Sequence, residues 1–311
     1  QMEGAEPGNL VEVELIDSED EFGMMKGKII RILEETGNLD LGFEMILREN
    51  SIREEFPANA IQEADSFPKR ILPQQHLGRV DQRHLAFITI DGKSARDFDD
   101  AVFVEKIENG GFRLFVAIAD VAHYVTPDSA IDEEAKKRGT SVYFPTHAIP
   151  MLPEALSNGL CSLRPGVNRL TLTCEMQLNQ DGECIDYRIY ESLIKSHARL
   201  DYDAVADFLD SGKKSISNKE IQKSLKLMQE LMHLLEEKRK RRGAIQFEFS
   251  ESSVEFDQQN RMTGMSKKFQ SSSMKMIEQF MLEANETVAR HCVKRKLPAL
   301  YRVHQPPSDL K

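Results

Sequence analysis

Alternating apolar and polar positions along the first 80 residues predict a small β-rich unit followed by a connecting segment. Leu10–Ile16 alternates apolar and acidic residues with period two, Met25–Leu33 follows it, and Leu39–Leu47 is expected to add a third strand. Three short strands are too few to close a five-stranded OB-fold barrel. Ile52–Ala64 indicates a short helix, and the prolines within residues 66–73 indicate a linker.

The middle of the chain is dominated by apolar runs that are typical of buried strands. Leu85–Ile90, Ala101–Val104 and Phe112–Ala119 are nearly continuous and rich in β-branched and aromatic residues. Leu170–Leu178 and Cys184–Ser192 predict an antiparallel pair joined by a short polar turn. A proline-punctuated irregular region lies between these two groups of strands.

Beyond residue 200 the apolar spacing changes to three and four residues, which predicts helices. Helices are expected there at Tyr202–Leu209, Asn218–Arg242 and Met274–Lys296, and further strands at Ala244–Phe249, Ser253–Phe256 and Ala299–His304. A short helix is also expected earlier, at Ile131–Arg138. The fold class that follows is α+β: an N-terminal partial OB-like β-barrel, then a mixed sheet with flanking helices.

Composition describes a soluble globular protein whose net charge of −10 is unevenly distributed. Residues 1–66 contain 17 acidic and 5 basic side chains, whereas the rest of the chain contains 34 acidic and 36 basic ones. Basic surfaces are therefore compatible with the second part. No apolar run reaches the length of about 18 residues that a membrane span needs. Four scattered cysteines without a C-x-x-C pair indicate a reducing, cytoplasmic setting.

Four carboxylates follow the predicted strand Leu85–Ile90 within ten residues, in the sequence DGKSARDFDD. Asp91, Asp97, Asp99 and Asp100 lie on a short loop, because a strand resumes at residue 101. Like charges held this close repel each other unless a cation compensates them, and carboxylates without Cys or His suit hard cations such as Mg²⁺ or Mn²⁺. A solvated acidic turn is the alternative, but the flanking strands and the embedded Arg96 favour a metal site.

Two other interpretations of charged or polar residues remain open. His123, after the strand that ends at Ala119, either contributes to a site or forms only local hydrogen bonds. The basic run Lys238–Arg242 is either an ordinary helix end or a phosphate contact. A Ca²⁺-binding loop does not fit residues 91–100, because Lys93 and Ala95 stand where that loop needs oxygen ligands.

Five motifs in a fixed order make the chain resemble the ribonuclease II family, in its ribonuclease R branch. The motifs are ITIDGKSARDFDDA, FVAIADVAHYV, SVYFPTHAIPMLP, LCSLRPGVNRLTLTCEM and FMLEANETVA, and ILRENSIREEFP favours that branch. The resemblance implies an RNB-type catalytic domain that hydrolyses single-stranded RNA processively from the 3′ end to nucleoside 5′-monophosphates. It also implies two Mg²⁺ ions, for which Mn²⁺ can substitute.

Site roles follow from the same resemblance, residue by residue. The family's four active-site aspartates are matched by Asp91, Asp97, Asp99 and Asp100. The metals are expected to be held by Asp91, Asp97 and Asp100. Asp99 is expected to orient water, substrate or a metal-bound ligand. Tyr143 matches the aromatic that stacks on the 3′-terminal base. Phe247 and Glu278 lie near where the family has an aromatic and a glutamate that clamp bases, and they are further substrate-binding candidates. Arg96 is a candidate from its place among the acids, where it would neutralise part of their charge or contact phosphate.

The same resemblance sets expected boundaries. Residues 1–50 should form the partial cold-shock, OB-like domain, residues 51–80 a helix and linker, and residues 81–311 the catalytic domain. Family members continue past the final motif into an arginine-rich segment, so the chain is expected to be a fragment. The alternative function is a catalytically inactive RNA-binding fragment or scaffold of the same fold.

Overall fold

The computed structural model describes residues 4–7, 9–19, 25–33, 38–144, 147–245, 250–257 and 262–303. Contacts divide the chain into one unit of residues 1–56 with 256–263 and a larger unit of residues 57–255 with 264–311. The two units are described separately. Within the described residues, no helix is both long and apolar enough to cross a membrane.

Among the described residues, the smaller unit includes a two-stranded sheet and a helix. As predicted, β1 (Leu10–Glu19) pairs antiparallel with β2 (Met25–Leu33). The third predicted strand is wrong, because residues 38–49 form helix α1 (Asn38–Glu49). Leu47 is buried at 6% exposure, whereas Met45, which would share its face in a strand, is 44% exposed.

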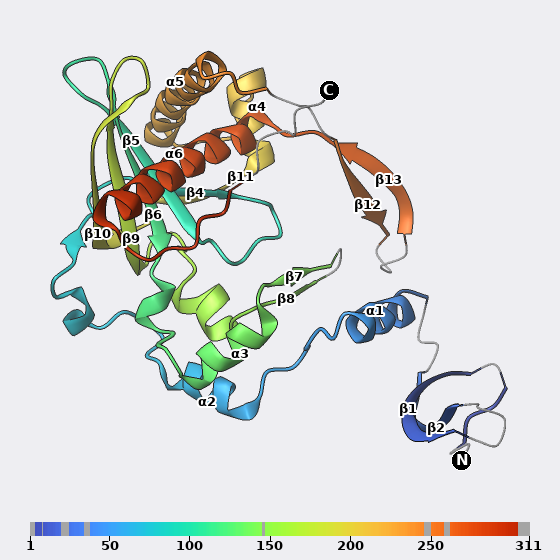
Figure 1. The fold of residues 1–311 in the computed structure, drawn as a ribbon. Coiled ribbons are helices and arrows are strands. Elements are labelled where there is room, and N and C mark those ends of the chain that lie inside the picture. The colour runs from blue at the N-terminus through green and yellow to red at the C-terminus, as the bar shows by residue number, and fades with distance from the viewer. Residues whose placement is uncertain are drawn as a thin grey trace, which may run out of the picture. The chain divides into compact units, whose positions relative to one another are not determined.

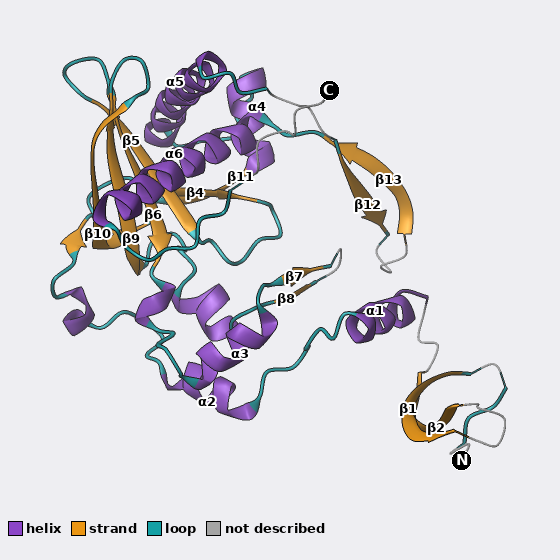
Figure 2. Cartoon of the chain, viewed as in Figure 1, coloured by secondary structure: helices purple, strands orange, loops and turns teal. Residues whose placement is uncertain are grey.

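A seven-stranded mixed sheet is the centre of the larger unit (Figures 1 and 2). Its strand order is β11-β4-β5-β6-β9-β10-β3, with parallel pairs at both edges and antiparallel pairs between them. The strands are β3 (Val80–Asp81), β4 (Ile88–Asp91), β5 (Asp100–Lys106), β6 (Phe112–Ala119), β9 (Asn168–Leu178), β10 (Cys184–Lys195) and β11 (Ala198–Asp201). Two smaller sheets pair β7 (Val142–Tyr143) with β8 (Ala148–Ile149), and β12 (Glu251–Phe256) with β13 (Met262–Lys268).

Helices cover both faces of this sheet, so its central strands are apolar on both sides. In β6, Leu114 and Val116 pack in one core cluster, and Phe115 and Ala117 pack in a second cluster. The first cluster includes residues of α4 (Tyr202–Ser211), α5 (Lys219–Arg241) and α6 (Ser272–Arg295); the second includes α2 (Ala58–Ser66), α3 (Ala130–Arg138) and the π-helical turn η3 (Ala155–Leu160). This arrangement explains the continuous apolar runs in the sequence.

Two further predictions, the start of the helix at Ile52 and the strand at Ala299–His304, differ from the structure. Helix α2 begins only at Ala58, because Pro57 has the extended ψ of 148° and residues 52–57 precede the helix. The strand expected at Ala299–His304 is absent over residues 299–303, where Leu300 is fully exposed and no partner strand is available among the described residues.

Candidate metal-binding site

The aspartate loop, residues 91–100, connects two neighbouring strands at one end of the large sheet. Asp91 is the last residue of β4, and Asp100 is the first residue of β5. The backbone of the loop continues into the sheet, because Ala119 N donates a hydrogen bond to Asp99 O at 2.9 Å. The core strands therefore fix both ends of the acidic segment.

Strand β11 holds the first part of this loop from the sheet edge. Its Arg199 Nη2 donates to Gly92 O at 2.6 Å and to Lys93 O at 2.9 Å. The guanidinium also lies 5.5 Å from the Phe98 ring centroid, a cation–π contact. Asp201 is in register with Asp91, but its carboxylate caps α4 by accepting from Ala204 N at 2.9 Å.

A second segment, residues 162–163, holds the later part of the loop. Buried Ser162 accepts a hydrogen bond at its Oγ from Phe98 N at 3.1 Å and donates to Arg96 O at 2.8 Å. Leu163 N donates to Phe98 O at 2.8 Å. The side chain of Phe98 is buried in the second core cluster, so it anchors the backbone between Asp97 and Asp99.

The carboxylates of the loop influence one another electrostatically. Burial, and then the charge of Asp100, raise the pKa of Asp91 to about 7, against a lowering by Arg199. Burial and Asp99 raise the pKa of Asp100 to about 6, and the pKa of Asp99 is raised by desolvation and by Asp97. The loop thus carries more negative charge than its own cations neutralise.

Tyr202, the first residue of α4, lies beside the same carboxylates. Burial, followed by the charges of Asp91 and Asp100, raises the pKa of its phenol to about 12. The loop itself offers carboxylate oxygens, and residues 91–100 contain no cysteine or histidine. This donor set fits a hard divalent cation such as Mg²⁺ or Mn²⁺.

A pocket of about 520 Å³ opens beside the aspartate loop. Arg96, Asp97, Tyr143 and His147 line it, so the β7–β8 hairpin and the loop share one concavity. The Tyr143 hydroxyl donates to Asp97 Oδ2 at 3.0 Å, while 68% of the tyrosine is exposed. An aromatic ring thus lies next to the acids and remains available to a ligand.

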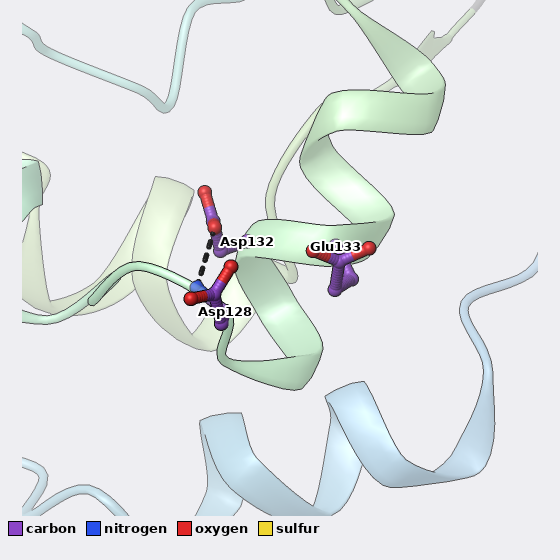
Figure 3. Close-up of side chains that lie close together, drawn as sticks. All are labelled: Asp128, Asp132 and Glu133. Carbon is purple, nitrogen blue, oxygen red and sulfur yellow. Dashed lines mark hydrogen bonds between the residues drawn. The ribbon is translucent and has the colours of Figure 1, made fainter.

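A different acidic group lies at the start of α3 (Figure 3). Among the described residues, Asp128, Asp132 and Glu133 form the one set of three or more potential ligands whose ligand atoms all lie within 4.8 Å. Lys136 Nζ already lies 3.6, 2.8 and 3.1 Å from these three side chains. Asp132 also accepts from Asp128 N at 2.8 Å, so the group completes a helix end and needs no metal.

Comparison with known proteins identifies both units. A model of the RNB domain matches residues 79–311, and a cold shock domain model matches residues 1–57. The chain belongs to the RNB family. The RNB match covers most of the large unit, including the aspartate loop, β7 and α6.

Relatives and solved structures agree with this membership. Ribonuclease R of Escherichia coli is 40% identical over 99% of this chain and 38% of its own length, and that of Vibrio parahaemolyticus is 40% identical over 99% and 37%. The Mycoplasma genitalium RNase R structure in complex with ribose methylated single-stranded RNA is 32% identical, with a TM-score of 0.90 over 96% of this chain and 47% of that chain. The chain therefore spans less than half the length of these proteins. Yeast Ssd1, a pseudonuclease, shares the fold at 19% identity and a TM-score of 0.67.

The other site residues predicted from the sequence have different contacts or lie outside the described residues. Glu278 on α6 accepts a hydrogen bond from Gln270 and lies 3.7 Å from Arg239 Nη1. Phe247 lies outside the described residues. His123 contacts Gln75 Nε2 at 3.0 Å and Arg79 Nη2 at 3.4 Å, which is the local hydrogen-bonding alternative.

The basic run at the end of α5 also favours the structural interpretation. Lys238 is buried against Glu283 Oε2 at 2.8 Å, and Arg242 pairs with Glu286 at 2.9 Å. Two residues that hold or border the aspartate loop, Arg199 and Ser162, were not predicted. No local pattern marks them, because their contacts with the loop reach across 64 or more residues.

Proposed function

We propose that the RNB unit is the catalytic part of a metal-dependent 3′-to-5′ exoribonuclease that degrades single-stranded RNA processively to nucleoside 5′-monophosphates. The observation that carries the proposal is the aspartate loop itself: four carboxylates anchored between buried strands, beside an exposed aromatic ring. Hydrolysis of a phosphodiester to a 5′-monophosphate requires a water nucleophile and compensation of negative charge on the phosphate, and an oxygen-only acidic site is suited to both through bound cations.

Asp91, Asp97 and Asp100 are the proposed ligands of Mg²⁺, and Asp99 is proposed to orient a water or substrate oxygen. At such a site two Mg²⁺ ions would supply water activation and stabilisation of the leaving 3′ oxygen. The chain's own contribution is positional. Arg199 and Ser162 fix the backbone that carries the acids.

Tyr143 is the proposed platform for the 3′-terminal base. Its ring is exposed, and its hydroxyl is held by Asp97, so a stacked base would stand directly beside the acidic loop. Stacking on an aromatic ring is independent of base identity, as repeated removal of nucleotides requires. Arg96 in the same pocket is a proposed phosphate contact. Glu278 and Phe247 remain proposed substrate contacts further along the RNA.

The alternative is an RNA-binding scaffold of the same fold without hydrolytic activity. Yeast Ssd1, which is described as a pseudonuclease, has the same fold, so the fold alone does not establish hydrolysis. The presence of all four aspartates in this chain supports the enzyme instead. A cytoplasmic location belongs to the proposal and is supported by four free cysteines.

The test compares two isosteric substitutions in the full-length protein. Asp99→Asn should abolish the stepwise shortening of a 5′-labelled oligoribonucleotide from its 3′ end in Mg²⁺, while the dissociation constant for that RNA stays within about twofold. Asp128→Asn is the control, because Asp128 belongs to the acidic group that Lys136 neutralises and Asn tolerates its left-handed φ of 64°. Wild-type hydrolysis by the Asp99→Asn variant would refute the assignment, and an inactive wild-type protein that binds RNA would support the scaffold.

A further inference from the structure

A second pocket lies along the π-helical turn η3, away from the aspartate loop. Ala155, Gly159 and Leu160 of the turn line this pocket of about 570 Å³, whereas Glu154 and Asn158 line the pocket at the loop. The two pockets share no lining residue. We name the second one the basic pocket after its charged lining residues, which are Asp65, Lys69, Arg70, Arg164 and Arg169.

Positive charge accumulates in the basic pocket although the chain as a whole carries a net charge of −10. Four cations and one carboxylate line it. Lys69, Arg70 and Arg164 are exposed, and none of them forms an ion pair with any residue that the structure describes. Such side chains, from two separate segments of the chain, can converge on an anion.

Arg169 provides an independent sign of an anionic ligand. Only 6% of it is exposed. Its guanidinium donates to the carbonyl oxygens of Ser162, Asn168 and Gly159 at 2.7, 2.9 and 2.8 Å. No carboxylate among the described residues pairs with it, so a full positive charge is buried without a counter-ion. Burial of an uncompensated charge is costly, and an anion in the pocket would reduce that cost.

Part of the lining is apolar. Phe67, Ile71, Leu160 and Val167 contribute carbon surface, and Asn168 adds an amide. A volume of about 570 Å³ lies within the range of sites for small organic ligands. Cations beside an aromatic and aliphatic wall match a molecule with a phosphate at one end and a flat base at the other.

We infer that the basic pocket binds a mononucleotide, with its phosphate at Arg70, Arg164 and Arg169 and its base against the apolar wall. The site is distinct from the aspartate loop but connected to it. Arg169 donates a hydrogen bond to Ser162 O. The Ser162 hydroxyl in turn donates to Arg96 O and accepts from Phe98 N. A ligand that engages Arg169 is therefore connected to the aspartate loop through the hydrogen bonds of Ser162. The binding itself does not require that the proposed hydrolysis is correct.

The experiment measures AMP binding by isothermal titration calorimetry in EDTA, which removes binding through a metal at the aspartate loop. The double substitution Arg70→Ser/Arg164→Ser should weaken AMP binding by about tenfold or more, because two charge-assisted contacts are lost. The control is Lys223→Ser/Lys226→Ser on α5. It removes the same charge from exposed positions on the helix layer that covers the other face of the sheet, and should change affinity by less than about twofold.

Adenosine and a tetraribonucleotide complete the design. Adenosine should bind more weakly than AMP and equally to both double variants, since it has no phosphate. Equal AMP affinity in the pocket and control variants would overturn the inference. It would also be overturned if the pocket variant lost affinity for the tetranucleotide but not for AMP, because that result indicates an extended RNA surface. Circular dichroism of each variant verifies that the fold is unchanged.

Discussion

Ser162→Ala tests whether the backbone clamp on the aspartate loop matters for both stability and function. The substitution removes the acceptor of Phe98 N at 3.1 Å and the donor to Arg96 O at 2.8 Å. Ser162 is fully buried and Phe98 is 8% exposed, so the Phe98 N–H would lose its partner without gaining water. A buried donor left unsatisfied costs about 1–3 kcal/mol, and loss of the second bond adds about 1 kcal/mol. The free energy of unfolding should fall by about 2–4 kcal/mol.

The measurement is urea unfolding in EDTA, with an unchanged m-value as the condition for comparing midpoints. Ser224→Ala is the matched control, because the buried Ser224 hydroxyl has no hydrogen-bond partner among the described residues. It should change the free energy of unfolding by less than about 1 kcal/mol.

A functional readout separates the clamp from general destabilisation. At a temperature where both variants are folded, Ser162→Ala should bind Mn²⁺ more weakly and hydrolyse RNA at least about tenfold more slowly, because small displacements of positioned groups are costly. The reasoning is refuted if Ser162→Ala matches Ser224→Ala in stability and matches the wild type in Mn²⁺ affinity.

Two further predictions concern the carboxylates and the exposed tyrosine. The folded-state pKa values of about 7 for Asp91 and about 6 for Asp100 lie above the ordinary 3.8, so protonation of these carboxyls favours the folded state. Their contribution to stability is fully present below pH 3.8 and is lost as the pH rises through 6 and 7. In EDTA the free energy of unfolding should therefore fall between about pH 4 and pH 7. Asp91→Asn should flatten that fall, and an unchanged pH slope in the variant would contradict the prediction. For Tyr143, RNA binding is measured by the anisotropy of a labelled RNA in the Asp99→Asn background. Tyr143→Ala should weaken binding by about tenfold, whereas Tyr143→Phe should leave it almost unchanged, since the ring supplies the stacking. Equal losses in both variants would assign the effect to the hydroxyl that Asp97 holds at 3.0 Å.

Local patterns in the sequence predicted elements whose surroundings are uniform. Phe112–Ala119 reads as a buried strand because both of its faces pack in a core, and β6 has these bounds. Leu39–Leu47 satisfies strand and helix spacing alike, and the burial of Leu47 on a helical face decides in favour of α1. Strand β11 was missed because Ala198–Asp201 is short and polar, and it exists through its pairing with β4.

The sequence predicted the acidic residues of the candidate site but not the residues that position them. The four aspartates are close in sequence, so the loop was visible before any fold was known. Tyr202 adjoins them only because α4 follows β11, and Arg199 reaches the loop from 107 residues away. The proposed mononucleotide site was invisible for the same reason, since its cations come from residues 69–70 and 164–169.

The long distance in sequence between the aspartate loop and Arg199 has a consequence for biosynthesis. A ribosome adds about 5–20 residues per second, so roughly 5–20 s separate the emergence of Gly92 from that of Arg199. During that interval the nascent chain carries all four acids but lacks the parallel pairing of β11 with β4 that fixes their backbone. Closing this non-local pair is slow compared with forming the adjacent hairpins. The last step in shaping the acidic loop would thus come after the central strands have folded, and divalent cations would meet an ordered site only then.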